Sequence, residues 1–192
     1  MLRAAKTLLS TIILAAALSP LACQADATPP PPPPPCDEKC QDGIAVKALR
    51  EMMKLAFNLT FQGKPVGEHD LSTPCMFGGS ARVHGTATSN AIQGATEVRL
   101  TYVFTSCGYQ FEDDDLDDNY EMTLDGTITQ EGIIAVQPSA ASAVVMKSDA
   151  MKLTGTVYDP PIDYAAECPV ELGQNGNTVT ARICGRDAKA EL

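Results

Sequence analysis

The spacing between apolar residues shortens along this chain from three or four positions to two. Over residues 44–61, apolar residues recur at alternating steps of three and four until Gly63 and Pro65 end the pattern, which is typical of an amphipathic helix. The apolar stripe includes the Met52-Met53 pair, and a stripe at helical spacing most often belongs to a core. We therefore predict one helix that packs on a sheet. The charged residues between the apolar ones, assigned to the polar face, are Lys47, Arg50, Glu51 and Lys54.

From Ser80 onward, apolar and polar residues alternate in several short segments, and alternation with a period of two is typical of strands. Short turns that contain Gly or Asn separate several of these segments. The order of elements predicts an α+β fold, mainly β, with one N-terminal helix packed on a curved antiparallel meander sheet or small barrel of about eight strands. The predicted strands span residues 80–87, 98–104, 120–129, 133–137, 143–147, 151–158, 166–172 and 178–184.

One short pattern, apolar-x-Gly-Thr-apolar, occurs at Gly85, Gly126 and Gly155. Each glycine falls on the same face as the apolar residues of its predicted strand. Glycine inside a strand marks a bend or a place where another backbone comes close. We expect these positions to coil the sheet around the helix. The alternative is that small residues merely fit a thin core.

The first residues have the organisation of an export signal. Arg3 and Lys6 give a positive start, and residues 7–18 form an apolar run too short to span a bilayer as a stable helix. Ala22 and Cys23 follow, and this arrangement resembles bacterial lipoprotein signal peptides. The resemblance is specific to residues 1–35, and it implies that residues 1–22 are removed as a signal peptide and that Cys23 is the site of lipid attachment.

Two further expectations concern this leader. Gln24 stands where some bacterial lipoproteins carry an Asp that retains them in the inner membrane, so the resemblance favours the outer membrane of the cell envelope. The alternative to a lipid anchor is an ordinary secretory cut after Ala27, which follows the small-x-small pattern and would discard Cys23.

Seven prolines at positions 29–35 predict a polyproline II segment. At about 3.1 Å per residue, such a segment would hold the rest of the chain roughly 20 Å from Cys23. We therefore divide the chain into a signal peptide (1–22), a lipid-anchor cysteine with a polyproline stalk (23–35), and a single disulfide-stapled globular domain (36–192).

Six cysteines remain when Cys23 is set aside, and an even number in an exported chain predicts three disulfides. Six cysteines allow fifteen pairings, so the connectivity is open. The positions of the predicted strands favour Cys75 with Cys107 and Cys168 with Cys184, which leaves Cys36 with Cys40. Zinc binding by the last pair is disfavoured, because the chain has only two histidines and the compartment is oxidising.

The charge of the chain restricts its partners. Without Arg3 and Lys6, the remaining chain has 12 basic and 24 acidic residues, a net charge of −12. We therefore expect no nucleic-acid partner, and we expect contact with the membrane only through the lipid anchor. The chain also lacks Trp, which disfavours the aromatic platforms used to bind sugars and single-stranded nucleic acids.

An acidic segment at residues 112–121 is the one candidate cation site. Asp113, Asp115 and Asp117 are two residues apart, a spacing that suits oxygen ligands of calcium. The rest of an EF-hand loop is missing, because Asp118 stands where the sharp turn needs glycine. The competing interpretation is a solvated loop tip with mutually repelling charges.

Catalytic motifs are sparse. His69 and Asp70 are adjacent, but they fall in a predicted loop with no nucleophile in a suitable context. We therefore expect a non-catalytic binding or structural role at the cell envelope, with an envelope protein as one class of partner and no resident cofactor. The alternatives are calcium-dependent or apolar-ligand binding, and less favourably a hydrolase. An apolar ligand would require that the helix leave the concave face of the sheet partly open.

Overall fold

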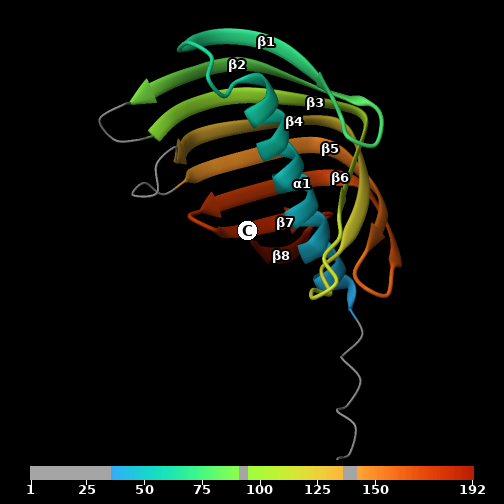
Figure 1. Ribbon diagram of the computed structural model, residues 1–192. Coiled ribbons are helices and arrows are strands. Elements are labelled where there is room, and N and C mark those ends of the chain that lie inside the picture. The colour runs from blue at the N-terminus through green and yellow to red at the C-terminus, as the bar shows by residue number, and fades with distance from the viewer. Residues whose placement is uncertain (1–35, 91–94, 136–141) are drawn as a thin grey trace, which may run out of the picture. The chain divides into compact units, whose positions relative to one another are not determined.

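A computed structural model describes residues 36–90, 95–135 and 142–192. The signal peptide, Cys23 and the stalk, which we expect within residues 1–35, lie outside the described residues. One helix and eight strands form a single compact unit (Figure 1). The elements are α1 (Glu38–Thr60), β1 (Gly67–Pro74), β2 (Ser80–Asn90), β3 (Ala95–Phe111), β4 (Tyr120–Ala135), β5 (Ala143–Val157), β6 (Ile162–Asn175), β7 (Thr178–Ile183) and β8 (Arg186–Glu191).

The strands form one antiparallel sheet in which each strand pairs with the next in sequence, from β1 to β8. The sheet is open, because β1 and β8 form its two edges. It is strongly curved, and α1 lies across its concave face (Figure 1). The predicted α+β, mainly β fold with a helix on a curved meander is therefore confirmed, and the sheet takes the open form rather than that of a small barrel.

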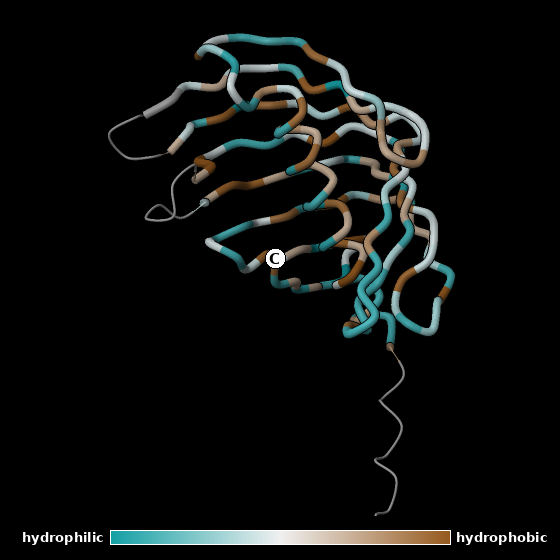
Figure 2. Tube along the Cα trace, in the orientation of Figure 1, coloured by the Kyte–Doolittle hydropathy of each residue, from teal (hydrophilic) through white to brown (hydrophobic). Residues whose placement is uncertain are grey.

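The hydrophobic core lies between α1 and the concave face. Figure 2 shows apolar and polar residues alternating along the strands. Because side chains of a strand point alternately to its two faces, the apolar set faces the helix. On α1, Leu49 and Met53 are completely buried and Met52 is 3% exposed. The methionine pair belongs to the core, as its helical spacing predicted.

Helix α1 begins at Glu38, six residues before the predicted start at residue 44. The side chain of Asp37 caps this end, because its Oδ1 accepts a hydrogen bond of 2.9 Å from the backbone N of Cys40. The first turns were missed because they carry mainly polar residues, so they show no apolar periodicity. Within the described ranges, no helix combines the length and the hydropathy that crossing a lipid bilayer requires.

The glycines of the repeated motif lie where neighbouring strands approach closely. Gly85 and Gly155 have φ values of 135° and 150°, which side chains other than glycine rarely adopt. A Cβ atom at Gly155 would lie 1.9 Å from the carbonyl oxygen of Glu121, and one at Gly85 would lie 2.1 Å from that of Arg99. The motif therefore marks close backbone approach in a curved sheet, in agreement with the prediction.

The predicted strand boundaries are wrong in the middle of the sheet. Strand β4 is continuous through Gly132, where we expected a turn, and β5 is continuous through residues 148–151. Gly132 has a φ of 129° and pairs with Val144, so it bends the strand without ending it. In β5 the register with β6 shifts between Ser148 and Met151, which identifies a bulge rather than a break.

The two edge strands were not predicted. Residues 67–74, assigned to a loop, form β1, and residues 186–191 form β8. Both strands are short and rich in polar residues, so their sequences lack the apolar alternation that identifies inner strands. The predicted number of about eight strands agrees with the observed number for two reasons that cancel. The prediction omits the two edge strands, and it divides β4 and β5 into two strands each.

Three disulfides link the pairs that the strand positions favoured. Cys75 follows β1 and bonds Cys107 on β3, with 5.4 Å between their Cα atoms. Cys168 on β6 bonds Cys184, which follows β7, with a Cα–Cα distance of 5.2 Å. Cys36 and Cys40 are joined across the start of α1. The first two bonds therefore staple neighbouring parts of the sheet.

Candidate functional site

The C-terminal half of α1 leaves part of the concave face open. Arg50, Lys54, Phe57 and Asn58 lie along one side of the helix, because they are separated by four, three and one residues. Between this side and the sheet lies a cavity of about 470 Å³. Small-molecule sites in proteins have volumes of this order. The lining residues are Arg50, Lys54, Phe57, Asn58, Tyr102, Gln130, Ile134, Ala135, Ser142, Gln174, Gly176, Asn177 and Leu192.

Polar side chains interrupt apolar rows of the concave face at this cavity. Gln130 on β4 lies in register with Leu100 on β3 and Met146 on β5. Gln174 on β6 lies in register with Val144 on β5. An apolar residue at such an inward position would add to the core, whereas a buried amide needs hydrogen-bond partners. The two glutamines therefore call for an explanation other than packing.

Arg50 is the buried charge of the site. Its side chain lines the cavity although the residue is only 5% exposed. Its Nε donates a hydrogen bond of 2.6 Å to Oε1 of Gln174, whose Nε2 donates in turn to the carbonyl oxygen of Gly176 at 2.7 Å. Burial lowers the pKa of the Arg50 guanidinium, with smaller opposite effects from Tyr102 and Glu51. An arginine nevertheless stays protonated in a protein, so the charge remains.

Tyr102 and Gln130 carry buried polar atoms that no described protein atom satisfies. Tyr102 is 0% exposed and Gln130 is 1% exposed. The Tyr102 hydroxyl and both amide atoms of Gln130 have no hydrogen-bond partner within the described part of the chain. Burial raises the pKa of the Tyr102 hydroxyl, so this group keeps its proton and can both donate and accept. Such unsatisfied groups are rare in native interiors and require a cause.

The lining has the opposite charge to the chain as a whole. The chain has 24 acidic residues, yet the described lining of the cavity contains the basic residues Arg50 and Lys54 and no Asp or Glu. Lys54 is half-exposed and pairs with Glu51, at 3.3 Å between Nζ and Oε2. No carboxylate of a described residue, that of Leu192 included, forms an ion pair with Arg50. The uncompensated charge of the cavity is therefore that of Arg50.

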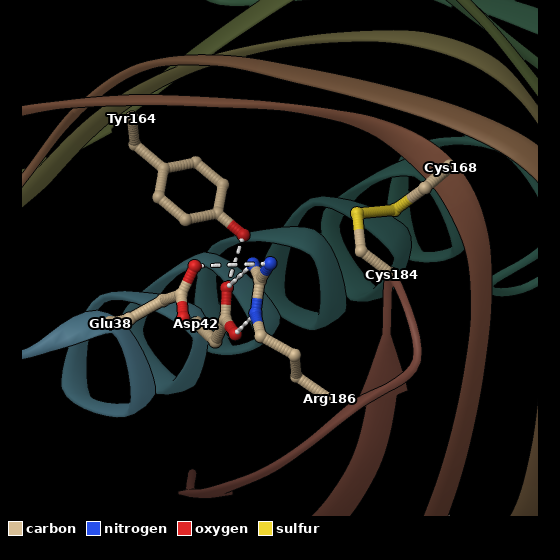
Figure 3. Close-up of a disulfide and its surroundings, with 6 residues drawn as sticks. All are labelled: Glu38, Asp42, Tyr164, Cys168, Cys184 and Arg186. Atoms are coloured by element: carbon tan, nitrogen blue, oxygen red, sulfur yellow. Dashed lines mark hydrogen bonds and ion pairs between the residues drawn. A yellow bond between two sulfur atoms is a disulfide. The ribbon is translucent and has the colours of Figure 1, made fainter.

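A second buried charge, at the other end of α1, shows what full compensation requires. Asp42 is 0% exposed. Its carboxylate accepts two hydrogen bonds from Arg186, at 2.7 and 2.8 Å, and one from the Tyr164 hydroxyl at 2.8 Å (Figure 3). Glu38 also pairs with Arg186, close to the Cys168–Cys184 disulfide (Figure 3). This cluster ties α1 to β6 and β8, and it leaves no oxygen of Asp42 free for a ligand.

The residues of the cavity do not stand out in the sequence pattern. The prediction that Arg50 lies on the polar face of the helix is wrong, because the residue faces the sheet and is buried. Gln130 fell between two predicted strands, and Tyr102 was counted only as an apolar residue of its strand. The available signal was a polar residue at an inward position, and it becomes visible only when the full length of β4 is known.

The pair His69 and Asp70 does not form a catalytic dyad. The two residues are neighbours on β1, so their side chains point to opposite faces of the sheet. His69 Nε2 lies 2.8 Å from the carbonyl oxygen of Pro65, and its ring packs edge-on against Phe61. Asp70 pairs with Arg82 on β2, which lowers the pKa of the Asp70 carboxyl.

The structure does not gather Asp113, Asp115 and Asp117 around one point. In this loop between β3 and β4, Oδ1 of Asp113 accepts a hydrogen bond of 3.0 Å from the backbone N of Asp115. The Asn119 side chain bonds the backbone of Asp113 in both directions, at 2.8 and 3.1 Å. No group of three or more His, Cys, Asp or Glu in residues 36–90, 95–135 and 142–192 is arranged to hold a metal ion.

The cavity is thus the candidate site, and it can bind a ligand that offers hydrogen-bond acceptors to Arg50 and polar atoms to Tyr102 and Gln130. Searches against protein-family models, curated proteins and solved structures find no match to this chain.

Proposed function

We propose that this protein is an exported, non-catalytic binding protein of the cell envelope, and that it holds a small polar ligand in the cavity between α1 and strands β3, β4 and β6. One observation carries the proposal: Tyr102 and Gln130 line the cavity, and both carry buried polar atoms that have no partner among the described residues. A bound ligand would supply those partners, and leaving them unsatisfied costs about 1–3 kcal/mol for each group.

The lining favours binding over catalysis. It contains no His, Cys, Asp or Glu among the residues that the structure describes, so the usual general bases and the thiol nucleophile are missing from it. Tyr102 is a poor base, because burial raises its pKa and keeps it protonated. The same lining also argues for a polar ligand in place of an apolar one, since Arg50, Tyr102, Gln130 and Gln174 all reach the cavity.

Two features support the proposed location. Three disulfides stabilise the domain, and such bonds persist in compartments outside the cytosol. The sequence of residues 1–35 resembles a lipoprotein leader followed by a polyproline stalk, and the resemblance implies that Cys23 is acylated. We propose the outer membrane as the anchoring site, because Gln24 follows Cys23. A ligand site carried on a stalk roughly 20 Å long would stand clear of the lipid surface.

The test uses the mature protein purified in detergent from its own cells. A small-molecule extract of those cells is added, and the melting temperature is followed. We expect the extract to raise the melting temperature of the wild type, because a ligand that binds only the folded state stabilises it. The Ile134→Trp variant places a large ring in the cavity lining, so the extract should not raise its melting temperature.

Ile133→Trp is the matched control. Residues 133 and 134 are neighbours on β4, so the side chain at 133 points to the opposite, convex face, where Ile133 is 41% exposed. This variant should respond to the extract like the wild type. Equal responses of both tryptophan variants, or the absence of any response in the wild type, would count against a ligand site in this cavity.

A further inference from the structure

Arg50 sets the charge of the ligand. A buried ion is strongly disfavoured unless an opposite charge and hydrogen bonds compensate it. Asp42 meets that requirement within the protein through Arg186 and Tyr164. Arg50 has only the neutral amide oxygen of Gln174 among the described residues. The Nη atoms of Arg50 are not among the fully buried atoms, so they are accessible from the cavity, and an anion there would supply the opposite charge that the described residues do not.

The contacts of the guanidinium narrow the class of anion. Arginine has five N–H donors in a planar fork, one on Nε and two on each Nη. Gln174 occupies the Nε donor, and the Nη donors make no hydrogen bond to a described residue. The edge between the two Nη atoms matches the spacing of two oxygens on one carboxylate, which can accept two parallel bonds. Gln174 would then hold the guanidinium in the orientation that presents this edge.

The unpartnered polar atoms of Tyr102 and Gln130 indicate which other groups the ligand carries. Their unpartnered atoms comprise one hydroxyl and one amide, which offer both donors and acceptors. These atoms are almost fully covered, so a second polar group on the ligand, such as a hydroxyl, an oxo or an amino group, would satisfy them after the two side chains turn toward the cavity. Phe57, Ile134 and Leu192 add apolar wall, so the body of the ligand also contains carbon.

We infer that the ligand is a small organic carboxylate, bound through its carboxylate to the Nη edge of Arg50 and through a second polar group to Tyr102 and Gln130. The inference rests on the proposed function, because it assigns a chemical class to the ligand of the same cavity. It is independent of the acidic loop and of the Asp42 cluster, because neither lines this cavity.

The experiment measures melting temperature and dissociation constants of the full mature protein against a defined panel. The probes are lactate, benzoate and 4-hydroxybenzoate, each paired with its neutral carboxamide, together with inorganic phosphate and glycerol phosphate, all at millimolar concentration. We expect carboxylates to raise the melting temperature and their carboxamides not to do so. The largest rise should come from probes that carry a hydroxyl group as well as the carboxylate.

Arg50→Met removes the charge at similar length and should weaken carboxylate binding about ten- to hundredfold, the range expected for losing charged hydrogen bonds. Tyr102→Phe should weaken only the probes that carry a hydroxyl group. Arg82→Met is the matched control, because Arg82 is an exposed arginine that pairs with Asp70 away from the cavity. Its dissociation constants should equal those of the wild type.

Four results would overturn the inference. They are equal binding of carboxylates and carboxamides, preferential binding of the phosphates, unchanged carboxylate binding by Arg50→Met, and no binding of any carboxylate in the panel. None of them decides the proposed function, which the cell extract and the Ile134→Trp variant test separately. A response to the extract without a response to any carboxylate would leave the cavity as a binding site for a ligand of another class.

Discussion

Asp42 and Arg50 lie on the same helix and are both buried, but their environments differ. The Asp42 carboxylate accepts three hydrogen bonds, and two of them come from a cation. Arg50 donates one hydrogen bond to a neutral oxygen. A paired buried charge holds elements together, whereas an unpaired one weakens the fold unless a ligand completes it. The first residue is therefore structural, and the second belongs to the ligand site that we propose.

This contrast predicts opposite effects of two similar substitutions on stability. Arg186→Met should lower the free energy of unfolding by about 3 kcal/mol, because it leaves the Asp42 carboxylate buried without its cation. Arg50→Met should change the same quantity by less than about 1 kcal/mol, because the methionine removes a buried charge that has no ionic partner. Urea denaturation of the ligand-free protein measures both values.

The control for these two variants is Arg182→Met. Arg182 is an exposed arginine whose Nε lies 3.9 Å from the Asp187 carboxylate, and such surface pairs contribute about 0–1 kcal/mol. A loss of stability in Arg50→Met as large as that in Arg186→Met would mean that Arg50 is a structural residue, and it would remove the main support for the site.

The residues of the cavity could not be predicted from the pattern of apolar and polar positions. Helical periodicity assigned Arg50 to the polar face, and only the curvature of the sheet brings strands over that side of α1. Gln130 becomes recognisable as an inward residue once β4 is known to run on to Ala135. The cysteine pairs, by contrast, could be inferred, because the two cysteines of each favoured pair flank a predicted strand segment.

At the scale of elements, the alternation of apolar and polar residues predicted the inner strands, but it failed where the sheet bends or ends. Gly132 and the bulge after Ser148 interrupt the alternation of β4 and β5 without ending either strand. The edge strands β1 and β8 carry charged residues, which block pairing with another chain but also hide the strands from pattern analysis. Where a strand bends and which strands form the edges both depend on the geometry of the whole sheet, which the local sequence does not contain.

The curvature of the sheet depends on glycines, and Gly155→Ala tests this. At Gly155 the backbone has a φ of 150°, and a Cβ atom would lie 1.9 Å from the carbonyl oxygen of Glu121. The substitution therefore adds backbone strain and a collision with a neighbouring strand. We expect it to lower the free energy of unfolding by at least about 2 kcal/mol, measured by urea denaturation.

Gly173→Ala is the matched control on β6. This glycine does not have a positive φ, and its nearest neighbour to an added Cβ is the Thr180 hydroxyl at 3.4 Å, which is ordinary contact. Its alanine variant should be within about 1 kcal/mol of the wild type. Similar stabilities of the two alanine variants would show that the repeated motif reflects small residues in a thin core and not close backbone approach.

At the scale of the whole molecule, the N-terminal half of α1 is held against the sheet, whereas its C-terminal half borders the cavity. Gly43 brings the helix so close to β8 that an added Cβ would lie 3.0 Å from the carbonyl oxygen of Lys189. The Asp42 cluster fixes the same end, and the cavity lies along the other half of the helix. A rigid sheet, stapled by two disulfides, therefore presents a preformed cavity, which limits the loss of conformational entropy when a ligand binds.

The last prediction concerns the proposed lipid attachment of this domain to the cell envelope. If Cys23 carries lipid, growth with an alkyne-tagged fatty acid should label the wild-type protein, and mass spectrometry should find Cys23 at the mature N-terminus. Cys23→Ser should lose the label, because serine has no thiol to acylate. Ala27→Leu, which blocks the alternative secretory cut, should keep both the label and the Cys23 terminus. An unlabelled wild-type protein that begins at Thr28 would instead establish the secretory cut, and the domain would then be released from the membrane with its polyproline segment as a free tail.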